Sequence, residues 1–195
     1  MTAPAAGPLR VCFVCSGNIC RSPTAEVVLR QLVADAGLTE QIVVDSAGTG
    51  PWHVGDEMDE RARATLVRRG YRPEVHRAKQ FHPDLFAERE LVVAIDRGHL
   101  ARLSQLAQLA ADPADAATTL VLARSFDSTA VAAGESDVPD PYYDGPSGFD
   151  EVLDQLERAC AGLLPTLAAA ARSAAAQVAQ DPGRDRAGDL LPPCR

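Results

Sequence analysis

A cysteine stands close to the N-terminus with an arginine six positions later, at the end of an apolar run. Residues 11–23 read VCFVCSGNICRSP, so five residues separate Cys15 from Arg21. Two of them, Gly17 and Asn18, are types that readily accept left-handed backbone angles, which allows the segment to curl into a cup. N–H groups can point into such a cup, and the following helix adds its free N-terminal amides and positive dipole end. The segment is therefore predicted to bind an oxyanion.

Cys15 is predicted to be a nucleophile at the base of this cup. A thiol that faces N–H dipoles and a guanidinium is expected to favour its thiolate form. Arg21 can clasp two oxygens of the anion, and Ser22 can donate a hydrogen bond to the sulfur. This combination is typical of attack on a bound phosphoryl group with a phosphocysteine intermediate. The alternative role, a packing thiol, suits Cys12, because residues three apart on a strand point to opposite faces.

The other cysteines indicate neither a metal site nor a disulfide framework. Cys12 and Cys15 have C-x2-C spacing, but no second cysteine or histidine pair follows to complete a zinc site. We therefore expect no metal and no cofactor. Cys20 lies inside the cup segment, where it is either a packing thiol or a partner for a reversible disulfide with Cys15 after oxidation.

A second candidate for chemistry is Asp140, which lies between Pro139 and Pro141. The two prolines stiffen the backbone, so this carboxyl could be held in place as the proton donor that phosphoryl transfer needs. The alternative is a solvated aspartate in a turn.

Trp52, the only tryptophan, follows Gly50-Pro51 in a loop. There its ring could form the wall of a pocket for an aromatic ring, or it could cover the edge of the sheet.

Residues 14–23, VCSGNICRSP, resemble the signature of the low-molecular-weight protein tyrosine phosphatases. Val14 stands where other C-x5-R phosphatases usually carry histidine. The later Asp-Pro-Tyr-Tyr motif, residues 140–143, matches the general acid and the two tyrosines of that family, although Asp144 stands where many members have glycine. The resemblance covers roughly residues 9–165. It implies Cys15, Arg21 and Asp140 as catalytic residues, and it implies a substrate site made of Ser16, Gly17, Asn18, Ile19, Cys20, Ser22, Trp52, His53, Tyr142 and Tyr143, with Ser46 and His76 in a supporting network.

The hydrophobic pattern predicts alternating strands and helices. Strands are expected at 9–14, 42–46, 91–95 and 119–123, and helices at 23–36, 56–69, 97–109 and 149–171, with Pro165 kinking or splitting the last. Residues 125–148 are rich in Asp, Pro, Gly and Ser and are expected to form a long loop. The fold class is therefore α/β, a doubly wound four-stranded parallel sheet with helices on both faces and a phosphate-binding loop after the first strand. We expect a flexible N-terminus over 1–8, a phosphatase domain over 9–172 and a mostly disordered tail over 173–195.

The composition and charge of the chain limit the kinds of partner that it is expected to bind. With 195 residues and 46% hydrophobic content, the chain can bury one good core. The net charge of -8 argues against nucleic acid or anionic membrane as partners. No apolar signal segment opens the chain, so a cytoplasmic protein is expected, although members of such a family can be exported without a signal peptide. The expected partners are phosphotyrosine-bearing proteins; a monomer is expected, but the sequence does not set the oligomeric state.

Three other functions compete with phosphotyrosine hydrolysis. The thioredoxin-coupled arsenate reductases share the fold and the C-x5-R loop, but they need two closely spaced late cysteines, and only Cys160 and Cys194 remain here. A module that binds phosphotyrosine without turnover would not need the nucleophile, clasp and acid together. The protein-arginine phosphatases resemble this sequence with threonine in place of Ile19, and the apolar side chain here favours an aryl ring over a guanidino group.

Overall fold

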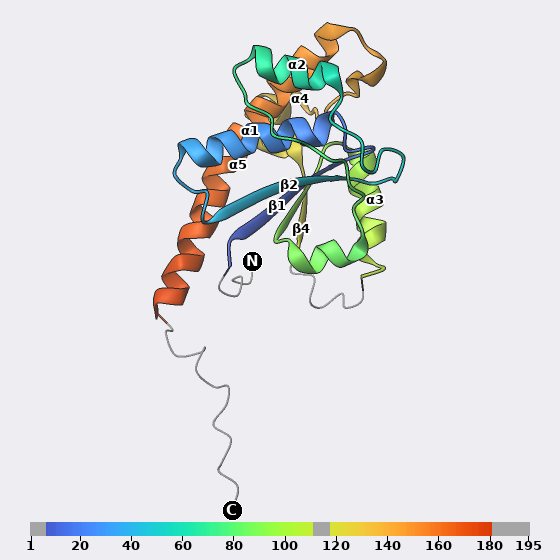
Figure 1. Cartoon of the computed structure of the whole chain (residues 1–195). Coiled ribbons are helices and arrows are strands. Elements are labelled where there is room, and N and C mark those ends of the chain that lie inside the picture. The colour runs from blue at the N-terminus through green and yellow to red at the C-terminus, as the bar shows by residue number, and fades with distance from the viewer. Residues whose placement is uncertain (1–6, 111–117, 181–195) are drawn as a thin grey trace, which may run out of the picture.

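The molecule is organised around a parallel sheet whose strands follow the order β2-β1-β3-β4. A computed structural model describes residues 7–110 and 118–180 (Figure 1). All three strand pairs are parallel, which confirms the predicted doubly wound α/β fold. The strands are β1 (Leu9–Cys15), β2 (Ile42–Gly48), β3 (Leu91–Ala94) and β4 (Thr119–Leu122).

Helices cover both faces of this sheet. Helices α1 and α5 pack on one face, and α3 with the short helix η1 lies on the other (Figure 1). The α-helices are α1 (Arg21–Asp35), α2 (Glu60–Arg68), α3 (Arg97–Ala107), α4 (Ser128–Ala133) and α5 (Pro146–Gln180), and the 3₁₀ helices are η1 (Pro83–Glu88), η2 (Ala123–Phe126) and η3 (Pro141–Tyr143).

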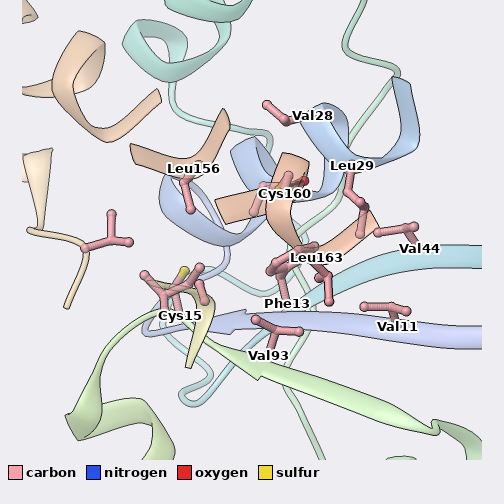
Figure 2. Close-up of a cluster of buried hydrophobic side chains, with 14 of the residues drawn as sticks. Val11, Phe13, Cys15, Val28, Leu29, Val44, Val93, Leu156, Cys160 and Leu163 are labelled. Carbon is pink, nitrogen blue, oxygen red and sulfur yellow. Dashed lines mark hydrogen bonds between the residues drawn. The ribbon is translucent and has the colours of Figure 1, made fainter. Parts of the chain in front are cut away.

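The central strand β1 contributes to two separate hydrophobic clusters because its side chains alternate between the faces. Phe13 and Cys15 belong to the cluster under α1 and α5, together with Leu163 (Figure 2). Cys12 and Val14 belong to the cluster on the α3 face. Cys12 therefore faces away from Cys15, as predicted from their spacing.

The carboxyl ends of β1 and β3 create the crevice in which a site can form. These strands are neighbours, but the chain leaves β1 toward one face and β3 toward the other, so the sheet has its topological switch point between them. Gly48 pairs with Cys15 at the end of β2. A Cβ at Gly48 would lie 2.7 Å from the carbonyl oxygen of Ser16, so only glycine allows β2 to approach the loop this closely.

The segment predicted as one long loop, 125–148, is partly helical. Asp127 caps α4 by accepting hydrogen bonds from the N–H groups of Thr129 and Ala130, and Gly134 ends the helix with a φ of 71°. The expectation of a single loop was wrong because a helix this short has too few apolar positions to show a period. Its cap and its terminal glycine were nevertheless visible in the sequence.

Pro165 does not split the last helix, because α5 is one helix from Pro146 to Gln180 (Figure 1), and a kink at this proline stays a prediction. Leu163 and Leu167 are buried against the core on either side of the proline. Proline removes one helical hydrogen bond, and the packing of this apolar face outweighs that loss.

The helix boundaries differ from the predicted ones at several ends. Helix α1 begins two residues before the predicted 23–36, and α2 begins four residues inside 56–69. Residues 173–180 are helical, where a disordered tail was expected. The remainder of that tail, most of the predicted flexible N-terminus and residues 111–117 lie outside the described residues.

Helix α5 is long and apolar enough between Pro146 and Ala176 to cross a membrane by length and composition alone. This is weak evidence, since a core helix of a globular protein meets the same test. Leu153, Leu156 and Leu163 of this helix are buried in the core under α1.

Candidate active site

The loop between β1 and α1 is held in a cup by Asn18, whose φ of 58° is left-handed as predicted. The Asn18 Nδ2 donates to the hydroxyls of Ser22 (3.0 Å) and Ser46 (2.8 Å), and its Oδ1 accepts from the N–H of Lys79 (2.9 Å). Nε2 of His76 lies 2.7 Å from the Asn18 carbonyl oxygen. These contacts offset the cost of a left-handed residue, and they place Ser46 and His76 behind the cup.

Cys15 lies at the bottom of a cavity of about 280 Å³. Its side chain is almost fully buried, and Sγ is 3.0 Å from the Ser22 hydroxyl. The Asn18 and Ser22 side chains are fully buried behind the loop, so they support the cup and do not line it. The lining consists of Cys15, Ser16, Gly17, Ile19, Cys20, Arg21, Trp52, His53, Asp140, Tyr142 and Tyr143.

Arg21 is buried at the first position of α1 and is held from two sides. Its Nη1 donates to Asp96 Oδ2 (3.0 Å) and to the Val138 carbonyl (3.2 Å), and its Nη2 donates to Asp140 Oδ2 (2.7 Å). Both hydrogens of Nη1 are thus used by the protein. Nη2 and Nε are the groups that can serve an anion in the cavity.

The Asp140 side chain is about half exposed, at 47%, and lies at the mouth of the cavity. Besides the Arg21 contact, it accepts a hydrogen bond from the N–H of Tyr142 (3.2 Å), which caps η3. Its carboxylate therefore sits on the guanidinium where an oxygen of a bound phosphoryl group would compete.

Asp96 and His99 belong to the site but were not among the predicted residues. Burial opposes ionisation of Asp96, but hydrogen bonds from His99 and the charge of Arg21 outweigh it and lower the Asp96 pKa to about 2. Nε2 of His99 lies 2.9 Å from the Ser16 hydroxyl. A signal for Asp96 was present, since it follows a buried strand almost directly, and the carboxyl ends of parallel strands carry the ligand site in this fold class.

Aromatic side chains form the outer wall of the cavity. Trp52 is 71% exposed and Tyr143 is 93% exposed, so Trp52 does not cover the edge of the sheet. The rings of Tyr142 and Tyr143 meet edge to face, with centroids 5.1 Å apart. Arg61 donates to the Tyr142 carbonyl (3.0 Å), which ties this wall to α2. His53 also lines the cavity, and its ring packs so closely on Gly17 that a Cβ there would be 2.6 Å away.

Cys20 shares the cavity with the nucleophile but has a different environment. Burial and the nearby negative charges of Asp59, Cys15 and Asp140 raise the Cys20 pKa, so it remains a thiol. Cys12, Cys15, Cys20 and Cys160 are all free. A disulfide between Cys15 and Cys20 after oxidation stays a prediction. Over residues 7–110 and 118–180, no group of three or more His, Cys, Asp or Glu side chains could hold a metal ion.

Comparison with known proteins gives one consistent family. The sequence model of the "Low molecular weight phosphotyrosine protein phosphatase" family matches residues 10–174. A low molecular weight protein-tyrosine-phosphatase of Streptomyces coelicolor is 52% identical over 155 residues, covering 80% of this chain and 91% of that protein. Among solved structures, an Entamoeba histolytica protein tyrosine phosphatase has a TM-score of 0.74 at 33% identity, covering 83% of this chain and 97% of the other. A Drosophila arginine phosphatase also has a TM-score of 0.74, at 28% identity, covering 81% and 97%.

Proposed function

Because this chain belongs to the low molecular weight phosphotyrosine protein phosphatase family, we propose that it hydrolyses phosphotyrosine in proteins with Cys15 as the nucleophile, Arg21 as the phosphate clasp and Asp140 as the general acid and base. The family is one of metal-independent, cysteine-based hydrolases. The observation that carries the residue assignment is the Arg21–Asp140 contact of 2.7 Å. It joins residues 119 positions apart in one cavity above Cys15.

Substrate binding begins with the exchange of one anion for another on Arg21. The phosphoryl group enters the cup, takes hydrogen bonds from the loop amides and replaces Asp140 on Nη2 of Arg21. The aryl ring lies between Trp52 and Tyr142 at the rim. The exchange also frees Asp140 to carry a proton beside the leaving oxygen.

Two displacements at phosphorus then follow. Sγ of Cys15 attacks phosphorus, the P–O bond to the tyrosine ring breaks, and Asp140 gives its proton to the departing phenolate oxygen. The Asp140 carboxylate next takes a proton from water, whose oxygen attacks the phosphocysteine. The S–P bond breaks, inorganic phosphate leaves and the thiolate is restored. Arg21 and the loop amides stabilise the charge on the equatorial oxygens in both steps.

The direct test compares hydrolysis of phosphotyrosine, phosphoserine and phosphoarginine peptides with a metal chelator present. We expect chelator-resistant release of phosphate from phosphotyrosine, with phosphoserine far slower because its short side chain cannot reach the base of the cavity. Activity that requires added metal, or phosphoserine as the best substrate, would contradict the proposal.

Asp140→Ala is expected to lower kcat/KM on phosphotyrosine peptides by roughly 10²–10⁴-fold, because the phenolate leaves without a proton. The loss should be smaller on 4-nitrophenyl phosphate, whose leaving group needs little protonation. Asp144→Ala, an exposed carboxylate four residues away, is the matched control and should leave kcat/KM near the wild-type value. Equal losses on both substrates would indicate a different proton donor.

Ile19 is expected to favour phosphotyrosine over phosphoarginine. Its side chain lines the cavity and packs on the core, so it offers an apolar edge to a ring and no hydrogen bond to a guanidino nitrogen. A polar group left unpaired costs about 1–3 kcal/mol, or roughly 5–150-fold. Ile19→Thr should shift the ratio of kcat/KM values toward phosphoarginine. Ile19→Val, which has the shape of threonine without its hydroxyl, should not. A wild-type enzyme with the higher kcat/KM on phosphoarginine would overturn this assignment.

A further inference from the structure

A chain of polar contacts connects the phosphate loop to helix α3 and returns to the clasp. Ser16, which follows the nucleophile and lines the cavity, has its hydroxyl 2.9 Å from Nε2 of His99. Nδ1 of His99 lies 2.9 Å from Asp96 Oδ1, and Asp96 Oδ2 accepts a hydrogen bond from Nη1 of Arg21 at 3.0 Å. The chain thus joins one wall of the cup to the guanidinium through residues that lie 75 to 83 positions away.

Asp96 is held in place by its contacts with the first turn of α3. Asp96 is ionised at neutral pH and can only accept hydrogen bonds, and its Oδ1 contacts Nδ1 of His99 at 2.9 Å. The Ser16 hydroxyl and Nε2 of His99 lie 2.9 Å apart, so the two side chains share a hydrogen bond. Asp96 also accepts from the backbone N–H of His99 (2.8 Å), so the carboxylate is fixed at the first turn of α3.

We propose that His99 and Asp96 are positioning residues for this phosphatase: they lock the Ser16 side of the cup and the Arg21 guanidinium into one geometry before substrate binds. This inference deepens the proposed function and rests on it. Asp96 and the Val138 carbonyl use both hydrogens of Nη1, which turns Nη2 and Nε toward the phosphoryl group. His99 in turn fixes Asp96 and the loop residue next to the nucleophile.

A cup held in this way needs no rearrangement as charge develops on the phosphoryl oxygens. Loosening it should therefore lower kcat more than it raises KM. His99 is 6% exposed, and a histidine that served only to pack α3 would behave differently. If His99 only packed α3, its loss would lower the stability of the protein, and the hydroxyl of residue 16 would have no effect on kcat.

The test uses two substitutions of the same shape, Ser16→Thr and Ser16→Val, which differ only in the hydroxyl. On 4-nitrophenyl phosphate, we expect kcat of Ser16→Val to be roughly tenfold below that of Ser16→Thr, as for loss of one hydrogen bond near a charged site. KM should agree within about twofold and the melting temperatures within a few degrees. Equal kcat values for the pair overturn the proposal, and this comparison leaves α3 unaltered.

A cycle with His99→Ala identifies the partner of the hydroxyl. In that background the Thr and Val variants should have the same kcat, because the hydroxyl has lost its hydrogen-bond partner. A gap that remains near tenfold would mean that the hydroxyl acts without His99, which also overturns the proposal. A wild-type enzyme without phosphatase activity would defeat the proposed function and this inference together. An active wild type with equal Thr and Val variants would defeat the inference alone.

Discussion

Cys15→Ser is expected to leave no measurable turnover of phosphotyrosine peptides while inorganic phosphate still binds. The serine hydroxyl is a weak nucleophile that no neighbouring base activates, whereas the loop amides and Arg21 that hold the anion are unchanged. Serine is close to cysteine in size, so the substitution removes little volume. The new hydroxyl would also lie next to the Ser22 hydroxyl, which Sγ of Cys15 already contacts. Steady-state kinetics measure the first effect, and calorimetric titration with phosphate measures the second.

Cys12→Ser is the matched control, since it makes the same change on the same strand. Cys12 lies in the cluster on the opposite face of the sheet, and burial followed by the charge of Asp45 raises its pKa, so it is a packing thiol. The folded fraction of this variant should turn over at close to the wild-type rate. Appreciable activity in Cys15→Ser would contradict the phosphocysteine mechanism.

Arg21→Lys is expected to lower kcat/KM by roughly 10⁴–10⁶-fold, because each of two donors to the transition state contributes about 10²–10³-fold. An ammonium group cannot clasp two oxygens of one phosphoryl group. It also cannot keep the contacts to the two carboxylates of Asp96 and Asp140 and to the Val138 carbonyl at the same time, so some of these groups lose their partner. Phosphate affinity should fall in the same variant, in contrast to Cys15→Ser.

Arg30→Lys provides the control on the same helix. Arg30 donates to the Val44 carbonyl and pairs with Glu26 and Glu74 away from the cavity, so its replacement should leave kcat/KM unchanged. If Arg21→Lys retained phosphate binding and lost less than tenfold in kcat/KM, the clasp would have to be assigned to another group.

The local chemistry of this protein was readable in the sequence because it depends on neighbours in the chain. The spacing of Cys15 and Arg21, with glycine and asparagine between them, specifies a loop that curls, and Asn18 has the left-handed φ that this requires. The alternation of β1 between two faces likewise separates Cys12 from Cys15. Both features follow from backbone geometry over a few residues. Strand identity and the doubly wound class follow from the same short-range periods.

Only the tertiary structure decided what surrounds Arg21. Its partners Asp96, Val138 and Asp140 lie 75, 117 and 119 positions away, and they meet because β3 pairs with β1 and the 125–148 segment returns over the switch point. Strand order depends on how helices pack on the two faces of the sheet, which no local pattern specifies. The same reason applies to Pro165, where packing on both sides keeps α5 one helix, and to Ser16, whose hydroxyl contacts His99 on a helix 83 residues later.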